Sequence, residues 1–541
     1  MIPDQVTQCS ISREFDQETL EKYFGLKCKK SIHHIDTLYY SVFLNEPSDI
    51  LELQERKRLP EGLQNMLLTL REMKSYLKQG FDVPVEIGDD MEATLKSFSM
   101  YDFCISKNEC FDIFILGHLP TAETPRCLIQ LRSRFLVLEG VVDALDESLR
   151  YLREFLAPFG LFPVKCCENR IDYAFHTNLI ENPGKFFCDK MLRLHLDTKL
   201  RIYQKIGKIG KDICVDTFNL GNRRSNNVYF RAYNKAREVI EMNYKSFFIS
   251  RWRQNELISE FDEFVYRRAY ELGSFRTGCL IGRLEWYLAH GGNAELLELC
   301  DKLIRSDYVK SDNCPDIERR IHNVIPEPTV IFNIEFQCKR KFFLSCKSWL
   351  DLNYSLNFKE LDDSGEFDPI LSDIYNILMN SKSIIDYLTR YHGVVSFVSN
   401  KNLTFKEFLE DGSYMNWWKR IRSTPVKYSK DSVCDVYREY DTKANIQKSK
   451  RLLMGQVTRV AMLKRSDTTV KSFEVDIIDA LCVVNDNDVV PYVKSPDFAD
   501  KVIQPLEYYN ISNRKARQLK GIIREDDDED KIIAAIDSGG K

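Results

Sequence analysis

Hydrophobic and polar residues alternate along several short stretches of this 541-residue chain, which is the pattern of half-buried β-strands. The clearest case is ENRIDYAFHTN, residues 168–178. Successive side chains of a strand point to opposite faces, so one face of this segment is apolar and the other carries Asp172 and His176. The apolar face carries Ile171, Tyr173 and Phe175. The pattern therefore predicts a strand that presents a carboxylate and an imidazole on its polar face.

A similar run, IDTLYYSVFL at 35–44, predicts a strand near the N-terminus. Apolar residues at three- and four-residue spacing predict helices around 63–77 and at 141–156, the second ending before Pro158 and Gly160. Further strands are expected at YDFCIS, CFDIFILG and CLIQLRSRFLVL.

The segments IDTLYYS and IDYAFHT both enter a strand through Ile-Asp. Two copies of a strand–helix–strand unit would form an antiparallel or mixed central sheet with helices on one face, which is an α+β fold. Ile-Asp is a common dipeptide, so chance explains the similarity of the two segments equally well.

Residues 214–235 predict a hairpin of two strands around a polar loop, and residues 236–310 predict helices. Another strand is expected in TVIFNIEFQCKRKFF, residues 329–343. Four regions follow: an N-terminal extension at 1–30, an α+β domain at 31–345, a mainly helical region at 346–470, and a C-terminal region at 471–541 that ends in a disordered acidic tail.

The composition is that of an ordinary globular protein, and the net charge of −4 does not by itself indicate a polyanionic partner. A run of six acids at 525–530 inflates the negative count, while basic clusters lie elsewhere. Sixteen cysteines without any C-x-x-C spacing argue against a zinc ribbon and favour reduced thiols. No stretch has the length of a membrane span, so we expect a cytoplasmic protein without a membrane partner.

The hairpin is the first candidate site. Its loop offers donors and amides suited to phosphate oxygens: Arg223, Arg224, Asn226 and Asn227. Along the next strand, alternation places Tyr229, Arg231, Tyr233 and Lys235 on one face. Such a face could stack bases and neutralise the backbone of single-stranded nucleic acid. A solvated sheet face with cation–aromatic pairs is the simpler alternative.

A second basic cluster lies in SYMNWWKRIRSTPVKYSK, residues 413–430. Its candidate DNA contacts are Lys419, Arg420 and Arg422. Tyr428 stands between Lys427 and Lys430, where positive charge would favour the phenolate. The simpler interpretation, which the sequence alone favours, is a basic surface helix whose tryptophans pack inward.

Two glutamates are embedded in apolar runs, Glu285 in RLEW and Glu335 in NIEF. A carboxylate in such a position needs a cation or a metal ion as partner. One of them, together with Asp172 and His176, would give mixed oxygen and nitrogen ligation that suits Mg²⁺ or Mn²⁺.

Five stretches together resemble the replication initiators of rolling-circle plasmids and filamentous-type phages, with the related relaxases of integrative elements. They are IQLRSRFLVLEG (129–140), ENRIDYAFHTN (168–178), FNLGNRRSNNVYFRAYNKAREV (218–239), RLEWYLAHG (283–291) and NIEFQCKRKFF (333–343). The R-x-Y-x-K that follows the hairpin loop is the most specific piece.

The resemblance implies a metal-dependent DNA nickase and strand transferase. A tyrosine attacks one phosphodiester at a single-stranded or extruded origin hairpin, keeps the 5′-phosphate and releases a 3′-hydroxyl that primes replication, with a host helicase as partner. Arg231 and Lys235 would hold the phosphate. Asp172 would be a metal ligand, whereas His176 stands where many relatives have an acid. Glu285 is preferred over Glu335 because Arg283 precedes it as in the family's R-x-E strand.

The resemblance makes Tyr428 the preferred nucleophile, with Tyr437 and Tyr440 as competitors. Two alternatives remain open at this stage. A relaxase for conjugative transfer would use the same chemistry, and a non-catalytic DNA-binding regulator would use the same basic sheet.

Overall fold

The computed structural model of this chain describes most of the first 438 residues. The described residues are 25, 29–45, 60–78, 83–86, 92–96, 101–117, 125–180, 192–194, 203–209, 212–221, 223–224, 226–243, 245–290, 325–357, 368–391, 393–400, 403, 405–430 and 432–438. Tyr440 and the whole of the expected C-terminal region 471–541 lie outside the described residues, as does most of the expected extension 1–30.

The described residues form an α+β fold, as predicted. The strands are β1 (Ser31–Leu44), β2 (Val83–Glu86), β3 (Glu92–Lys96), β4 (Phe103–Lys107), β5 (Phe111–Ile115), β6 (Cys127–Leu131), β7 (Pro163–Thr177), β8 (Leu192–Leu194), β9 (Tyr203–Ile209), β10 (Asp212–Leu220), β11 (Val228–Asn234), β12 (Phe332–Lys339) and β13 (Val395–Phe397). The α-helices are α3 (Glu61–Lys78), α4 (Ser133–Leu138), α5 (Val141–Leu156), α7 (Lys235–Glu238), α8 (Phe247–Gln254), α9 (Glu260–Leu272), α10 (Phe275–Ala289), α13 (Arg340–Ser345), α14 (Lys347–Asn357), α16 (Ser372–Met379), α17 (Ser381–Thr389), α18 (Phe405–Asp411) and α19 (Asn416–Arg422). Three short helical turns complete the description: η2 (Ala157–Phe159), the π-type η4 (Val239–Asn243) and η6 (Pro369–Leu371).

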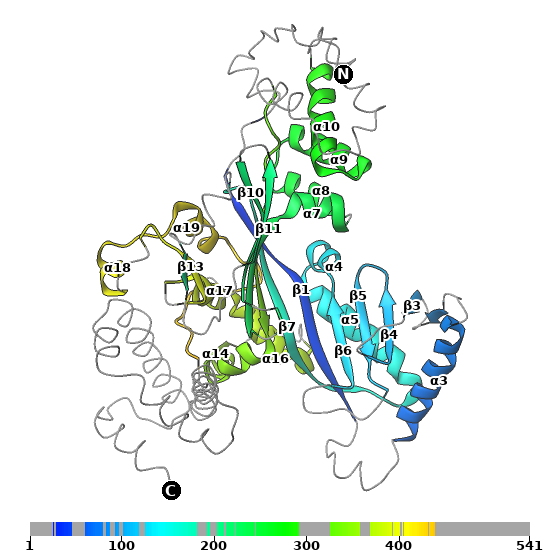
Figure 1. The fold of residues 1–541 in the computed structure, drawn as a ribbon. Helices are drawn as coiled ribbons and strands as arrows, with labels where there is room; N and C mark the ends of the chain where they lie inside the picture. Colours follow the sequence, from blue (N-terminus) through cyan, green and yellow to red (C-terminus); the bar gives the residue numbers. More distant parts are fainter. Residues whose placement is uncertain are drawn as a thin grey trace, which may run out of the picture.

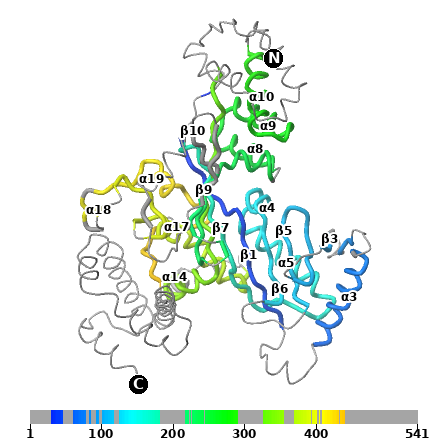
Figure 2. Tube along the Cα trace, in the orientation of Figure 1, coloured from blue at the N-terminus to red at the C-terminus, as the bar shows by residue number. Residues whose placement is uncertain are grey.

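Eleven strands form one sheet in the order β2-β3-β4-β5-β6-β1-β7-β12-β11-β10-β9, and each described pair is antiparallel. The two longest strands, β1 and β7, lie side by side in the middle, as Figure 1 and the tube in Figure 2 show. The first part of the chain adds strands outward from β1 and the second adds strands outward from β7. Strands β8 and β13 form a separate two-stranded sheet.

One face of the large sheet is apolar and covered by helices. Tyr40 of β1 shares a hydrogen bond of 2.7 Å with Ser148 of α5, and Tyr173 of β7 accepts one from Ser381 of α17. Trp418 of α19 packs edge-on against Phe230 of β11 and at a tilt against Phe336 of β12. Strand side chains and helix side chains thus share one continuous hydrophobic core, which is the main source of stability in a fold of this kind.

Helices α8, α9 and α10 build a second core at one end of the sheet (Figure 1). Trp252 of α8 donates a hydrogen bond of 3.0 Å to Nδ1 of His176, on the sheet face opposite the main core. The prediction that all helices lie on one face is therefore wrong for α8. The physical reason is that His34, His176 and Phe248 form an aromatic cluster that must itself be covered.

Membrane-spanning segments and the state of the cysteines can both be examined in the described residues. None of the described helices is long and apolar enough to cross a membrane. The cysteines that the structure describes are free thiols, most of them buried.

The packing of α5 against the sheet gives a stability prediction. Leu145 of α5 is fully buried in the main core, whereas Leu68 of α3 is 52% exposed. We expect Leu145→Ala to reduce the free energy of unfolding by about 2–5 kcal/mol because it leaves a cavity. Leu68→Ala is the matched control and should change it by less than about 0.5 kcal/mol. Urea denaturation followed by tryptophan fluorescence measures both, and equal midpoints for the two variants would contradict this packing.

Candidate functional site on the polar face of the sheet

The side of the four strands β1, β7, β12 and β11 that lies opposite the main core forms a polar face, which α8 covers at His34 and His176. Strand β12 shows its origin, since Ile334, Phe336 and Cys338 point into the core while Glu335, Gln337 and Lys339 point away from it. We call the following residues the polar face: His34, Tyr39, Arg170, Asp172, His176, Tyr229, Arg231, Tyr233, Asn333, Glu335, Gln337 and Lys339.

Strand register brings side chains far apart in sequence into rows across this face. Asp172 of β7 pairs with Gln337 of β12, which pairs with Tyr229 of β11. One row further, Glu335 pairs with Arg231. The R-x-Y-x-K segment and the strand that carries Asp172 therefore share one face.

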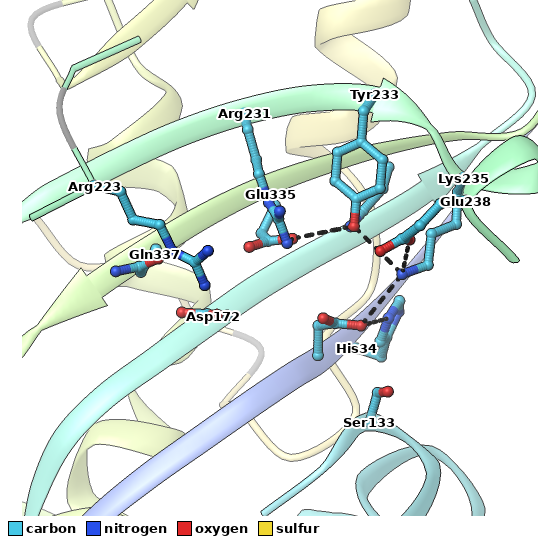
Figure 3. A network of polar contacts seen from close by, with 12 residues as sticks. His34, Ser133, Asp172, Arg223, Arg231, Tyr233, Lys235, Glu238, Glu335 and Gln337 are labelled. Carbon is cyan, nitrogen blue, oxygen red and sulfur yellow. Dashed lines mark hydrogen bonds and ion pairs between the residues drawn. The ribbon is translucent and has the colours of Figure 1, made fainter. Parts of the chain in front are cut away.

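Glu335 of β12 contacts several other side chains of the polar face (Figure 3). Its side chain is 1% exposed and its Oε2 accepts a hydrogen bond of 2.8 Å from Arg231, whose side chain is 25% exposed. The amide of Asn333 donates to the same oxygen at 3.1 Å, and the Tyr233 hydroxyl lies 3.5 Å away. A buried carboxylate thus holds a guanidinium that reaches the solvent.

Lys235 lies beneath this group, at the start of α7. Its ammonium is 2.7 Å from Glu238, 3.3 Å from the Tyr233 hydroxyl and 3.7 Å from Asp36 (Figure 3). Burial by itself lowers the pKa of Lys235, but these neighbours outweigh it and raise the pKa above its usual value. Burial also acts on the pKa of Asp36, which Lys235 nevertheless holds well below its usual value. Lys235 is therefore a fixed positive charge under the polar face.

Asp172 of β7 binds an arginine in the same way as Glu335 does. It is 1% exposed and accepts two hydrogen bonds from Arg170, one of them 2.8 Å long from Nε. Burial nevertheless raises the pKa of Asp172 to about 7, with Arg170 acting in the opposite direction. Next to it, Arg223 of the hairpin donates to Gln337 at 3.3 Å.

The hairpin loop is tied to β12 through its backbone. Lys339 donates to the carbonyl oxygens of Arg223 and Arg224, at 2.6 and 2.9 Å, and its own amide donates to the carbonyl of Asn227. Both arginine side chains are exposed, as is Asn227, while Asn226 packs against Gly221. The predicted loop contacts thus lie at the edge of the polar face.

This arrangement suits the binding of phosphate groups. Each of the buried acids Asp172 and Glu335 fixes one guanidinium in place, so the guanidinium needs no ordering when an anion arrives. Arginine in such a fork geometry is well matched to phosphate oxygens. The polar face therefore provides preorganised cations, with Tyr39 and Tyr229 beside them.

The predicted metal ligands do not come together. The strand rise of about 3.3 Å per residue puts Asp172 and His176 ~13 Å apart along β7, too far to share an ion. His176 instead lies in the aromatic cluster with Trp252, where burial lowers its pKa well below the usual value.

Glu285 lies on helix α10, not on a strand, and pairs with Arg268 of α9 at 2.9 Å. The expected R-x-E strand is wrong because Gly278 and Gly282 let α10 pack closely against the backbone of α9. The reserve residue, Glu335, is the one on the polar face.

A divalent ion would need other ligands among the described residues. Two buried oxygens, Glu335 Oε1 and Asn333 Oδ1, have no hydrogen-bond partner in the part of the chain that the structure describes. However, no group of three His, Cys, Asp or Glu in that part lies close enough together to hold an ion. The requirement for Mg²⁺ or Mn²⁺ stays a prediction.

The predicted nucleophile, Tyr428, lies on the other side of the sheet. Its hydroxyl is 3.3 Å from Nδ1 of His33, and the ring of His33 packs against Phe175 in the main core. Burial raises the pKa of Tyr428 well above its usual value. The expectation of an exposed, electrostatically assisted tyrosine is wrong, because Tyr428 packs against the apolar face. Tyr437 packs against the same core.

The basic residues of α19 also lie away from the polar face. Trp417, Trp418 and Ile421 are buried in the main core, as expected for a surface helix with inward tryptophans. Lys419 and Arg420 are exposed, and Arg422 pairs with Asp386 and Thr389. These three cations do not join the site on β7, β11 and β12.

Several residues of the polar face were not singled out from the sequence. They are Arg170, Asn333 and Gln337. Asp36, which pairs with Lys235 beneath the face, was not singled out either. The alternation in NIEFQCK contains the signal for Asn333 and Gln337, but only the strand pairing shows that Asn333 lies beside Tyr233 and Gln337 beside Asp172.

No model of a known protein family matches this chain, and a search of curated proteins likewise finds no match.

The raised pKa of Asp172 predicts how stability depends on pH. The folded protein binds this proton more tightly than the unfolded chain, where the ordinary pKa is 3.8. The stability gained from the proton is therefore present at low pH and is lost as the pH rises through about 7. In urea denaturation between pH 4 and 8, the wild type should lose stability relative to Asp172→Asn. Asp435→Asn, at an exposed acid, is the control that should run parallel to the wild type. Parallel profiles for D172N would contradict the assignment.

Proposed function

We propose that this protein nicks and transfers a DNA strand at an origin of rolling-circle replication, and that the polar face is its DNA site. The observation that carries the proposal is the position of the R-x-Y-x-K side chains. Arg231, Tyr233 and Lys235 lie together with Glu335 on one face, in contact with one another. The resemblance to rolling-circle initiators supplies the reaction, and the face supplies groups that suit it.

The DNA backbone lies over the guanidiniums in this proposal. Arg231 and Arg170 each use only some of their N–H groups on the acid that holds them, and Arg223 is exposed at the hairpin. These donors bind phosphate oxygens next to the bond that is cleaved. Lys235, which Glu238 and Asp36 hold in place beneath the face, is the second cation that the resemblance assigns to the phosphate.

Tyr229 is the nucleophile in this proposal. Three tyrosines occupy the polar face: Tyr39, Tyr229 and Tyr233. The Tyr233 hydroxyl is buried among Lys235, Asn333 and Glu335, and cannot reach a substrate. Tyr229 is only half buried; burial raises its pKa, while Arg231 and Arg223 act in the opposite direction.

The reaction then follows from these positions. The Tyr229 oxygen forms a bond to phosphorus and gives its proton to water, while the bond from phosphorus to the 3′-oxygen breaks and that oxygen takes up a proton. The 5′-phosphate stays on the tyrosine and the 3′-hydroxyl primes synthesis with a host helicase. A relaxase for conjugative transfer would use the same steps.

A DNA-binding regulator without catalysis is the second candidate. The observation in its favour is that burial raises the pKa of all three tyrosines of the polar face. A nucleophile needs the opposite, whereas binding of a DNA backbone does not.

We also infer that the sheet consists of two similar halves. Each half starts with a long central strand that contains Ile-Asp, at 35–36 in β1 and at 171–172 in β7. Each half ends with a strand that pairs with its own long strand and leads directly into a short helix, α4 after β6 and α13 after β12.

A nicking assay tests the proposed function. The purified protein is incubated with supercoiled plasmid that carries the DNA around its own gene, with Mg²⁺ or Mn²⁺, and relaxed DNA and protein–DNA adduct are measured. We expect Arg231→Ala to reduce nicking at least about 100-fold. Tyr229→Phe should abolish the adduct, whereas Tyr428→Phe should retain it because Tyr428 faces the main core.

Lys419→Ala is the matched control, since Lys419 is an exposed cation on α19, and it should leave nicking unchanged. Loss of the adduct in Tyr428→Phe but not in Tyr229→Phe would move the site to the other face. DNA binding by the wild type without relaxed product or adduct under either ion would favour the regulator.

A further inference from the structure

The first half of the sheet carries an arginine–acid pair of the same design as the two described above. Arg132, directly after β6, donates through Nε to Asp112 of β5 at 2.8 Å, and a second nitrogen binds the same oxygen. The side chain of Asp112 is 5% exposed and that of Arg132 is 36% exposed. As with Glu335 and Arg231, a buried carboxylate holds a guanidinium that reaches the solvent.

This pair belongs to the polar face. The charge of Asp112 acts on the pKa of the Tyr39 hydroxyl, as do the charges of Arg170 and Asp172. Leu131 pairs with Leu38, and Leu38 with Ile171, so Arg132 continues the row that holds Asp172. The Asp112–Arg132 pair is thus the third acid–arginine pair on this face, after Glu335–Arg231 and Asp172–Arg170.

Lys245 links the two halves. Its ammonium donates to Ser133, the residue after Arg132, at 2.8 Å. It also lies near enough to Asp36 and Lys235 for their charges to act on it. Cations therefore follow one another across the central strands, from Arg132 through Lys245 to Lys235 and Arg231.

We propose that Arg132 and Lys245 form a second phosphate-binding site, so that one DNA strand crosses the sheet from β11 over β7 and β1 to β6. The inference rests on the proposed function in that the polar face binds DNA, but it does not need the nicking step. Arg132 and Arg231 are four strand spacings of about 4.8 Å apart, or ~19 Å. Only a strand of several nucleotides reaches both.

The test measures affinity for oligothymidylates of increasing length, from about 4 to about 16 nucleotides, by fluorescence anisotropy at several salt concentrations. For the wild type, affinity should rise with length until the strand reaches Arg132. Arg132→Ala should bind the shortest oligonucleotide as the wild type does and the longest about tenfold more weakly. Its salt slope on the longest should fall by about 0.7. Arg231→Ala should lose affinity at every length.

Arg134→Ala is the matched control. Arg134 lies two residues further on in α4 and pairs with the exposed Glu109, so its removal should change none of these values. Arg132→Lys, which keeps the charge, should restore most of the salt slope, and thermal melting of each variant establishes that it is folded.

Two results separate this inference from the proposed function. Wild-type protein that binds DNA and is unaffected by Arg132→Ala at any length would overturn the second site alone. An equal loss for Arg132→Ala at all lengths would also overturn it, because the strand would then not cross the sheet. Wild-type protein that binds no oligonucleotide would overturn both proposals.

Discussion

Ion pairs between buried acids and partly exposed arginines determine which charged groups one face of the sheet presents. On one face of the sheet, Glu335 holds Arg231, Asp172 holds Arg170 and Asp112 holds Arg132. A carboxylate without a partner could not be buried to this extent, and a guanidinium without the carboxylate would not keep one orientation. Each pair explains both why an acid lies within a strand and why a cation stands over it.

The same pairs affect how the polar face could bind a metal ion or a phosphate group. Because Asp172 and Glu335 each bind an arginine, Asp172, His176 and a glutamate are not brought together as one ligand set among the described residues. Because the guanidiniums are fixed in advance, they can bind a phosphodiester without a large loss of side-chain entropy. In the proposed function the DNA backbone binds these guanidiniums, and catalysis depends on whether a tyrosine beside them reaches the phosphorus.

The sequence predicted the direction of side chains within each strand better than the contacts between strands. Alternation in ENRIDYAFHTN and VYFRAYN correctly separated Asp172 and Arg231 from the core side chains, because side-chain direction in a strand is a local property. The partners are not local. Arg231 meets Glu335 across 104 residues of chain, and no pattern around either residue indicates the register that joins them.

The wrong predictions have the same origin. RLEW resembles a strand in isolation, but glycines at 278 and 282 allow a close helix pair, which makes it part of α10. Tyr428 follows basic residues and a proline, yet its position is decided by packing against His33, 395 residues earlier in the chain.

A crystal structure of the protein with a bound single-stranded oligonucleotide tests the proposed DNA site directly. We expect phosphate oxygens within hydrogen-bond distance of Arg231 and Arg170, with the strand lying on the polar face. DNA bound over Lys419, Arg420 and Arg422 of α19, with the polar face empty, would contradict it.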